Sequence, residues 1–112
     1  MTMESALPMI PTLASGEEAA WDGYYGNLVP RYDTDRTDVA ASAAAGMADA
    51  LLAERRKRKL PLDELTAWDG YVANLGPKYD VNRQAVAAAA AADMADAMLV
   101  ERRRRVAPTG QT

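Results

Sequence analysis

The sequence predicts an all-α fold built from two tandem helical hairpins, and three observations support this prediction. Residues 21–58 and 68–105 align without a gap at an offset of 47 residues, with 25 of 38 paired positions identical. In both copies, bulky apolar residues recur at helical spacing, and a proline separates them from a long alanine-rich run. A repeat of this length, bounded by turn residues, is typical of a duplicated supersecondary unit.

Composition limits the chain to one ordinary domain. It has 112 residues, 49% of them hydrophobic, which is typical of a globular protein too small for two independent large cores. The chain contains neither cysteine nor histidine. The first absence excludes disulfides and thiolate metal sites, and the second removes the commonest metal ligand and general base.

The N-terminal stretch is apolar but does not have the features of a membrane or secretion signal. Residues 6–14 are interrupted by Pro8 and Pro11, follow no basic region, and are too few to cross a bilayer. We expect residues 1–14 to form a flexible arm of a cytoplasmic protein that does not associate with membranes.

Each copy is predicted to begin with a short amphipathic helix. Ser15 is the expected N-cap of the first one, with Glu18 as its capping-box partner. Pro30 and Pro77 are expected to end the two helices, because proline lacks the amide donor and disfavours helix in the residue before it. The apolar stripes occupy matching positions: Trp21, Tyr24, Tyr25 and Leu28 in one copy, and Trp68, Tyr71, Val72 and Leu75 in the other.

A long helix is predicted to follow each proline, over roughly residues 34–59 and 81–105. Asp33 and Asp80 are the expected N-caps, with Asp35 or Asn82 as alternatives. About 25 residues at 1.5 Å each give rods of about 38 Å, which should organise the fold. Their expected inner stripes consist of small or flexible residues: Val39, Ala43, Met47, Ala50 and Leu51, and Val86, Ala90, Met94, Ala97 and Met98.

Two such hairpins, residues 15–59 and 60–105, are expected to pack as one four-helix bundle with an approximate two-fold axis, leaving residues 106–112 as a disordered tail. The alternative is that each hairpin stays open and pairs with a second chain, which would make a homo-oligomer. Replacing either tryptophan with alanine should cost about 3–5 kcal/mol if the rings fill the seam. The predicted core consists of Trp21, Tyr24, Leu28, Met47, Leu51, Trp68, Tyr71, Leu75, Met94 and Met98.

Two pairs of matched residues invite a functional interpretation. Gly23 and Gly70 lower helix stability, and a glycine that occurs in both copies despite this cost could permit the close approach of a partner. The alternative is simple inheritance from the duplication, which preserves neutral residues too. Asp49 and Asp96 are expected on the solvated outer face of the long helices. Asp93 and Asp96 resemble half of a carboxylate metal site, but without histidine or further inward carboxylates we predict no metal.

Positive charge is concentrated at the ends of the two long helices. Nine of the thirteen basic residues lie there, although the net charge is -3. These residues could bind the phosphates of a nucleic acid. Alternatively, they could contact a protein partner, or only complement the helix dipole and form i,i+4 pairs with nearby glutamates. The acidic pI of 4.9 is unlike that of a nucleic-acid-binding domain, so it favours a protein-facing or solvated helix end. These candidate contact residues are Arg55, Arg56, Lys57, Arg58, Lys59, Arg102, Arg103, Arg104 and Arg105.

The residues give no support for catalysis or for a cofactor. Ser5, Ser15 and Ser42 have no histidine to activate them, and the sequence has no glycine-rich phosphate loop. We therefore predict a protein that is not an enzyme.

The repeated unit resembles a group of small bacteriophage-encoded helical proteins of unassigned function. The likeness lies in the short aromatic helix, the turn and the long helix ending in residues 48–58, ADALLAERRKR, and it covers both repeats. It implies a phage or prophage accessory protein, here in two tandem copies. The resulting prediction is a non-enzymatic interaction module that binds or inhibits a host protein, for example one of host defence. Nucleic-acid binding through the arginine-rich ends and a structural role in a virion are the alternatives.

Overall fold

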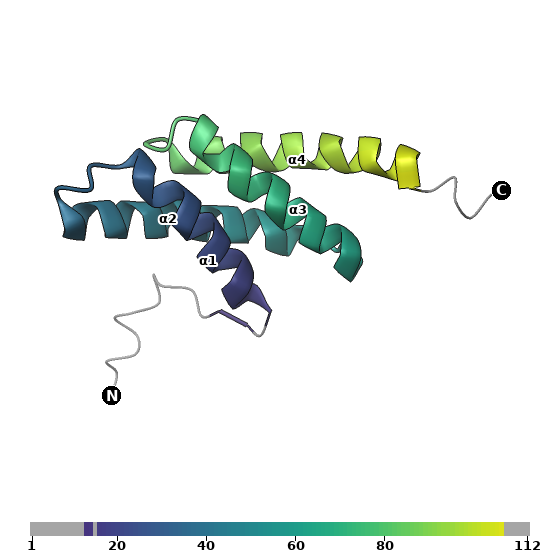
Figure 1. Cartoon of the computed structure of the whole chain (residues 1–112), viewed down its shortest axis with the longest axis horizontal. Helices are drawn as coiled ribbons and strands as arrows, with labels where there is room; N and C mark the ends of the chain where they lie inside the picture. Colours follow the sequence, from purple (N-terminus) through teal and green to yellow (C-terminus); the bar gives the residue numbers. More distant parts are fainter. Residues whose placement is uncertain (1–12, 15, 107–112) are drawn as a thin grey trace.

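Four α-helices form the described part of the computed structural model, residues 13–14 and 16–106 (Figure 1). This confirms the predicted all-α, four-helix fold. Ser15, most of the expected arm and residues 107–112 of the expected tail lie outside the described residues, whereas Val106 still belongs to the last helix. The elements are α1 (Glu17–Leu28), η2 (Val29–Arg31), α2 (Thr37–Lys57), α3 (Leu62–Leu75), η3 (Gly76–Lys78) and α4 (Gln84–Val106).

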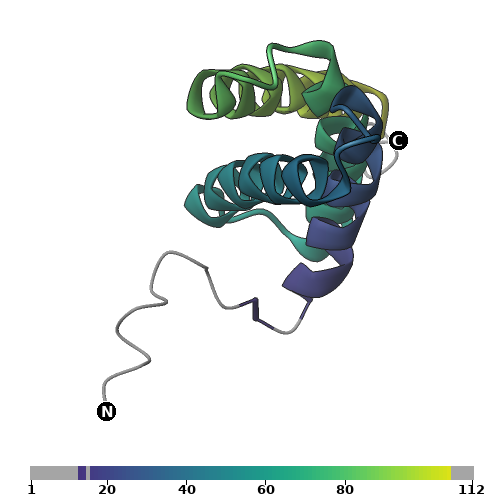
Figure 2. The ribbon, with the colours of Figure 1, turned by 90° about the vertical axis from the view of Figure 1, so that its left-hand side faces the viewer.

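The helices lie in two layers. The short helices α1 and α3 lie side by side in one layer, and the long helices α2 and α4 lie side by side in the other (Figures 1 and 2). Along the chain, α1 and α2 form the first hairpin and α3 and α4 the second. Equivalent helices run in the same direction, so the second hairpin resembles a displaced copy of the first (Figure 1).

The turn within each hairpin follows the predicted proline, but its aspartate does not cap the long helix as predicted. Pro30 lies in η2, directly after α1. The Asp33 carboxylate accepts a hydrogen bond from the Asp35 amide at 3.1 Å, and α2 begins only at Thr37 without a side-chain cap. Asp80 makes the matching turn with the Asn82 amide at 3.0 Å. Aspartate readily closes such a turn on its own backbone, which delays the helix start.

The core lies between the two layers and between the two hairpins. Of the ten residues predicted for it, Tyr24, Leu28, Met47, Leu51 and Trp68 are fully buried. Partial burial is found for Trp21, Tyr71, Leu75 and Met98. The prediction for Met94 was wrong, because its side chain is 45% exposed.

The predicted inner stripes of the long helices were right only in part. In α2, Met47 and Leu51 are fully buried and Ala43 and Ala50 are half-buried, but in α4 Met94 and Ala97 are exposed. Val39 and Val86 are 51% and 57% exposed. Alanine is the commonest residue in each long helix and occurs on all its sides, so hydrophobicity varies little around the axis and sequence periodicity does not fix which side faces inward. The side that packs is the one on which small residues allow close helix approach. Its alanines are Ala40, Ala44 and Ala48 in α2, and Ala87, Ala88, Ala91, Ala92 and Ala95 in α4.

The two hairpins stack front to back, which corrects the expectation of an approximate two-fold axis. A two-fold axis would bury equivalent residues equally. Met47 is buried but its equivalent Met94 is exposed, whereas Trp68 is buried and its equivalent Trp21 is only partly buried. One face of the first hairpin therefore contacts the opposite face of the second, as in stacked helical repeats.

Candidate functional site

The contact between the two hairpins is anchored by Asp69 of α3. Its carboxylate accepts a hydrogen bond from the Tyr24 hydroxyl at 2.6 Å and from Arg55 Nε at 3.0 and 3.2 Å. Tyr24 is fully buried, so desolvation, together with the bond to Asp69, raises the pKa of its hydroxyl. The first hairpin thus contributes a tyrosine and an arginine, and the second contributes the carboxylate that binds both.

A second polar anchor involves Asp96 of α4. Arg58 Nε and the Trp68 indole N–H each donate to its Oδ1 atom at 2.9 Å, and the guanidinium lies 5.4 Å from the Trp68 ring centroid. Burial alone would raise the pKa of Asp96, but the hydrogen bonds from Arg58 and Trp68 outweigh it and lower the pKa. The anchor joins the end of α2 to both helices of the second hairpin.

The matched aspartates of the long helices are surface residues only in part: the Asp96 side chain is 43% exposed, but both carboxylates bind a tryptophan. Asp49 accepts the Trp21 indole N–H at 2.9 Å, as Asp96 accepts that of Trp68. These contacts were not predicted, because the sequence of an alanine-rich helix defines its rotation poorly.

Backbone contacts complete the internal interface. The Tyr32 hydroxyl donates to the Val81 carbonyl at 2.9 Å, and the Gln84 amide donates to the Ala43 carbonyl at 2.9 Å. A Cβ atom at Gly76 would lie 3.3 Å from Leu51 Cδ1. The first hairpin thus approaches the η3 backbone so closely that a side chain there would force Leu51 to move.

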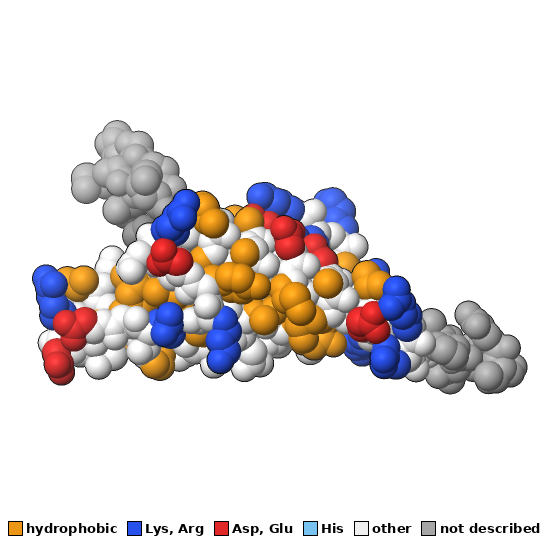
Figure 3. Space-filling model, turned by 90° about the horizontal axis from the view of Figure 1, so that it is seen from above, with side chains coloured by type: hydrophobic (Ala, Val, Ile, Leu, Met, Phe, Trp, Pro, Cys, Tyr) orange, Lys and Arg blue, Asp and Glu red, His pale blue; other side chains and the backbone are white. Residues whose placement is uncertain are grey.

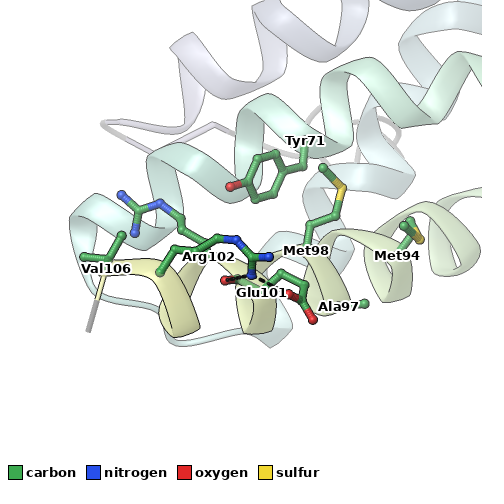
Figure 4. Close-up of a pocket in the computed structure, with 8 residues that line it drawn as sticks. Tyr71, Met94, Ala97, Met98, Glu101, Arg102 and Val106 are labelled. Carbon is green, nitrogen blue, oxygen red and sulfur yellow. Dashed lines mark hydrogen bonds and ion pairs between the residues drawn. The ribbon is translucent and has the colours of Figure 1, made fainter. Parts of the chain in front are cut away.

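The second hairpin carries an open groove of about 520 Å³ between α3 and α4. Tyr71 reaches from α3 toward α4, where Met98 and Arg102 lie (Figure 4). The face made by these two helices shows apolar side chains along its middle and charged groups near the end of α4 (Figure 3). The lining residues are Tyr71, Met94, Ala97, Met98, Glu101, Arg102, Arg105 and Val106.

Three of the groove residues, Tyr71, Met94 and Met98, had been predicted as core. These residues belong to the second repeat, and no hairpin among the described residues packs on this face of it. In stacked repeats each unit contacts only its neighbours, so the outer face of an end unit stays uncovered.

The basic clusters mostly form ion pairs within the protein. Two pairs link the long helix to the start of the short helix of the same hairpin, Arg56 to Glu17 at 2.7 Å and Arg103 to Glu64 at 2.6 Å. Lys59 is exposed. The other predicted contact residues pair as follows: Arg55 with Asp69, Lys57 with Glu54, Arg58 with Glu54, Asp93 and Asp96, Arg102 with Asp63, and Arg104 and Arg105 with Glu101.

The Glu17–Arg56 pair should make the stability depend on acid pH. The hydrogen bonds from Arg56, together with that from the Ala14 amide, lower the pKa of Glu17 from 4.5 to about 2. A carboxylate with a lowered pKa in the folded state stabilises that state above the unfolded pKa and loses its contribution as pH falls through the folded pKa. We expect the free energy of unfolding to decrease between about pH 4.5 and pH 2, and less so in Glu17→Gln. Urea titrations at several pH values would measure this.

The matched control is Glu18→Gln, because Glu18 is the exposed neighbour in the same helix. Its acid dependence should equal that of the wild type. Equal slopes for the wild type and Glu17→Gln would show that the ion pair does not contribute to folding in solution.

The two glycines of the short helices do not serve a close approach within the molecule. A Cβ atom built at Gly23 or Gly70 meets no atom within 4 Å. The carbonyls of these residues accept hydrogen bonds from Asn27 at 2.8 Å and Asn74 at 2.9 Å. Both glycines therefore face open space on the outer side of their layer.

In residues 13–14 and 16–106, His, Cys, Asp and Glu side chains form no group of three that could hold a metal ion. No helix in the same part of the chain is long and apolar enough to span a membrane. The sequence matches no protein-family model, no curated protein and no solved structure.

Proposed function

We propose that this protein acts by binding another protein, as a phage or prophage accessory module directed at a host protein in the host cytoplasm. The groove of the second hairpin is its main contact surface. One observation carries the proposal: the groove repeats, at equivalent positions, the surface with which the first hairpin holds the second. It has an apolar floor for burial and cationic groups at its rim, the usual composition of a docking surface.

The charges of the helix ends favour a protein partner over a nucleic acid. Eight of the nine basic residues predicted as contacts form an ion pair with a carboxylate of the same chain. Phosphates would have to compete with these carboxylates, and the acidic net charge of -3 would oppose a nucleic acid at long range.

The proposal can be tested with a groove variant and a matched control. Met94 and Val100 both belong to α4 and are both 45% exposed, but only Met94 lines the groove. We expect tagged wild-type protein and Val100→Glu to retain the same partner from host lysate after nuclease treatment, and Met94→Glu to lose it, because the new carboxylate would have to be desolvated in the contact.

Two outcomes would contradict the proposal. Recovery of nucleic acid, with loss of the retained proteins after nuclease treatment, would favour the nucleic-acid alternative, and the affinity should then fall steeply with salt. Equal retention by Met94→Glu and the wild type would show that the groove is not the contact surface.

A further inference from the structure

We infer that the groove also binds a second copy of this chain, so that molecules associate front to back in the way that the two hairpins are stacked within one molecule. The inference rests on the proposal that the groove is a protein-docking surface, and it names an occupant for it. The occupant's contact surface would be the face of α1 and the start of α2 that points away from the second hairpin.

The groove is composed of the same positions that the first hairpin uses in the internal interface. Tyr71, Met94, Met98, Arg102 and Arg105 are the equivalents, 47 residues later, of the contact residues of the first hairpin. In the first hairpin these residues are Tyr24, Met47, Leu51, Arg55 and Arg58, which are buried or ion-paired against α3 and α4. The second hairpin therefore presents the same surface, and none of the residues that the structure describes covers it.

The complementary surface is present on the first hairpin. A shallow hollow of about 170 Å³ lies there, lined by Tyr25, Val29, Thr34, Thr37, Ala40 and Ala41. The equivalent residues of the second hairpin are Val72, Gly76, Val81, Gln84, Ala87 and Ala88, and all except the half-buried Gln84 are buried. The groove of the second hairpin thus corresponds to the surface that the first hairpin contributes to the internal interface. The hollow of the first hairpin corresponds to the surface that the second hairpin contributes, and together with Asp22 it is called the held face below.

Charge complementarity supports the same pairing. Asp22 is exposed and is the equivalent of Asp69, which accepts hydrogen bonds from Tyr24 and Arg55. In a front-to-back contact, Tyr71 and Arg102 would reach Asp22 of the second copy. Arg105 would reach Asp49 and the Trp21 ring of the second copy, as Arg58 reaches Asp96 and Trp68.

The docking between molecules should be weaker than the internal one. Tyr25 and Val29 replace the smaller Val72 and Gly76, whereas Met98 replaces Leu51 on the groove side. Within the molecule, Leu51 packs so closely on Gly76 that a side chain there would displace it. Between molecules, Val29 takes the place of Gly76 and Met98 that of Leu51. The unbranched side chain of Met98 can move aside for Val29. We therefore expect reversible association that increases with concentration and, because this contact does not close, open-ended chains of molecules.

Sedimentation velocity over a concentration series would test the inference, using one variant for each face. Asp22→Arg alters only the held face and Met94→Glu alters only the groove. We expect the wild type to form species larger than a dimer as concentration rises, and each variant alone to stay monomeric. Mixing the two variants should produce a heterodimer and nothing larger, because one intact groove then meets one intact held face.

Matched controls lie outside both faces. Val100→Glu and Asp38→Arg change exposed residues whose equivalents in the other hairpin, Ala53 and Ala85, are also exposed. Both controls should associate like the wild type. Recovery of the heterodimer also shows that the two face variants are folded.

Three results would overturn the inference: a wild type that stays monomeric at every concentration, association that both face variants retain, or a variant mixture that stays monomeric. The proposed function fails separately. If the wild type is monomeric but Met94→Glu still loses a host protein, the groove is a docking surface for that protein and not for a second copy. If the chain self-associates but Met94→Glu retains its partner from the lysate, the proposed binding of a host protein by the groove is wrong.

Discussion

Trp68→Ala is expected to lower the free energy of unfolding by about 3–5 kcal/mol, the largest loss for any single residue of this protein. The Trp68 ring is fully buried where the two hairpins meet. Its indole N–H donates to Asp96, and Arg58 lies over its face. Alanine would leave a cavity and remove both polar contacts, so the loss combines packing and hydrogen bonding. Chemical denaturation followed by circular dichroism would measure it.

Trp21 provides the matched comparison, since it occupies the equivalent position in the first hairpin. Its indole also donates to an aspartate, Asp49, and its ring stacks on Tyr25 at a centroid distance of 4.7 Å. Because Trp21 is only partly buried, we expect Trp21→Ala to cost about 1–2 kcal/mol. Equal losses for the two variants would contradict the front-to-back stacking, since an approximate two-fold axis makes the two environments alike.

Sequence alone predicts the hairpins well because each signal is local. Proline ends the short helices at nearly the expected residues, and the aromatic spacing identifies their packed side. The rotation of α2 and α4 could not be predicted, because a helix surface of alanine offers no apolar contrast to orient it. This explains why the bonds from Asp49 and Asp96 to the tryptophans were not predicted. Met94 is exposed for a different reason, because this face of the second hairpin is uncovered whereas the equivalent Met47 is buried.

The candidate site was predictable in chemistry but not in location. The arginine clusters were identified, yet the sequence could not show that Arg55 and Arg58 face the second hairpin while Arg102 and Arg105 line an open groove. The two repeats share 25 of 38 paired residues, including all four of these arginines, so local sequence does not show which copy is covered; the stacking order decides it. The groove therefore arises because this face of the second hairpin is uncovered, and six of its eight lining residues are identical to their equivalents in the first hairpin.

Asp69→Ala is expected to have the second largest effect, a loss of about 2–3 kcal/mol in the free energy of unfolding. The substitution leaves the buried Tyr24 hydroxyl and the mostly buried Arg55 guanidinium without their shared acceptor. The control is Asp22→Ala, the same change at the exposed equivalent position, which should shift the free energy by less than about 0.5 kcal/mol. Urea denaturation of the two variants at neutral pH would measure both values. Alanine has a higher helix propensity than aspartate, and this gain is the same in both variants, so it cancels in their difference.

A double-mutant cycle with Tyr24→Phe separates the hydrogen bond from the ion pair. Removing the hydroxyl abolishes one donor to Asp69, so the two substitutions should show a coupling energy of about 1 kcal/mol or more. Because the pKa of Tyr24 is raised in the folded state, the wild type should also lose stability as pH rises above about 10, and Tyr24→Phe should lose less. A coupling energy near zero would mean that Tyr24 and Asp69 do not interact in solution. Asp69 would then hold the hairpins through Arg55 alone, and Asp22 could not be expected to bind Tyr71 of another molecule.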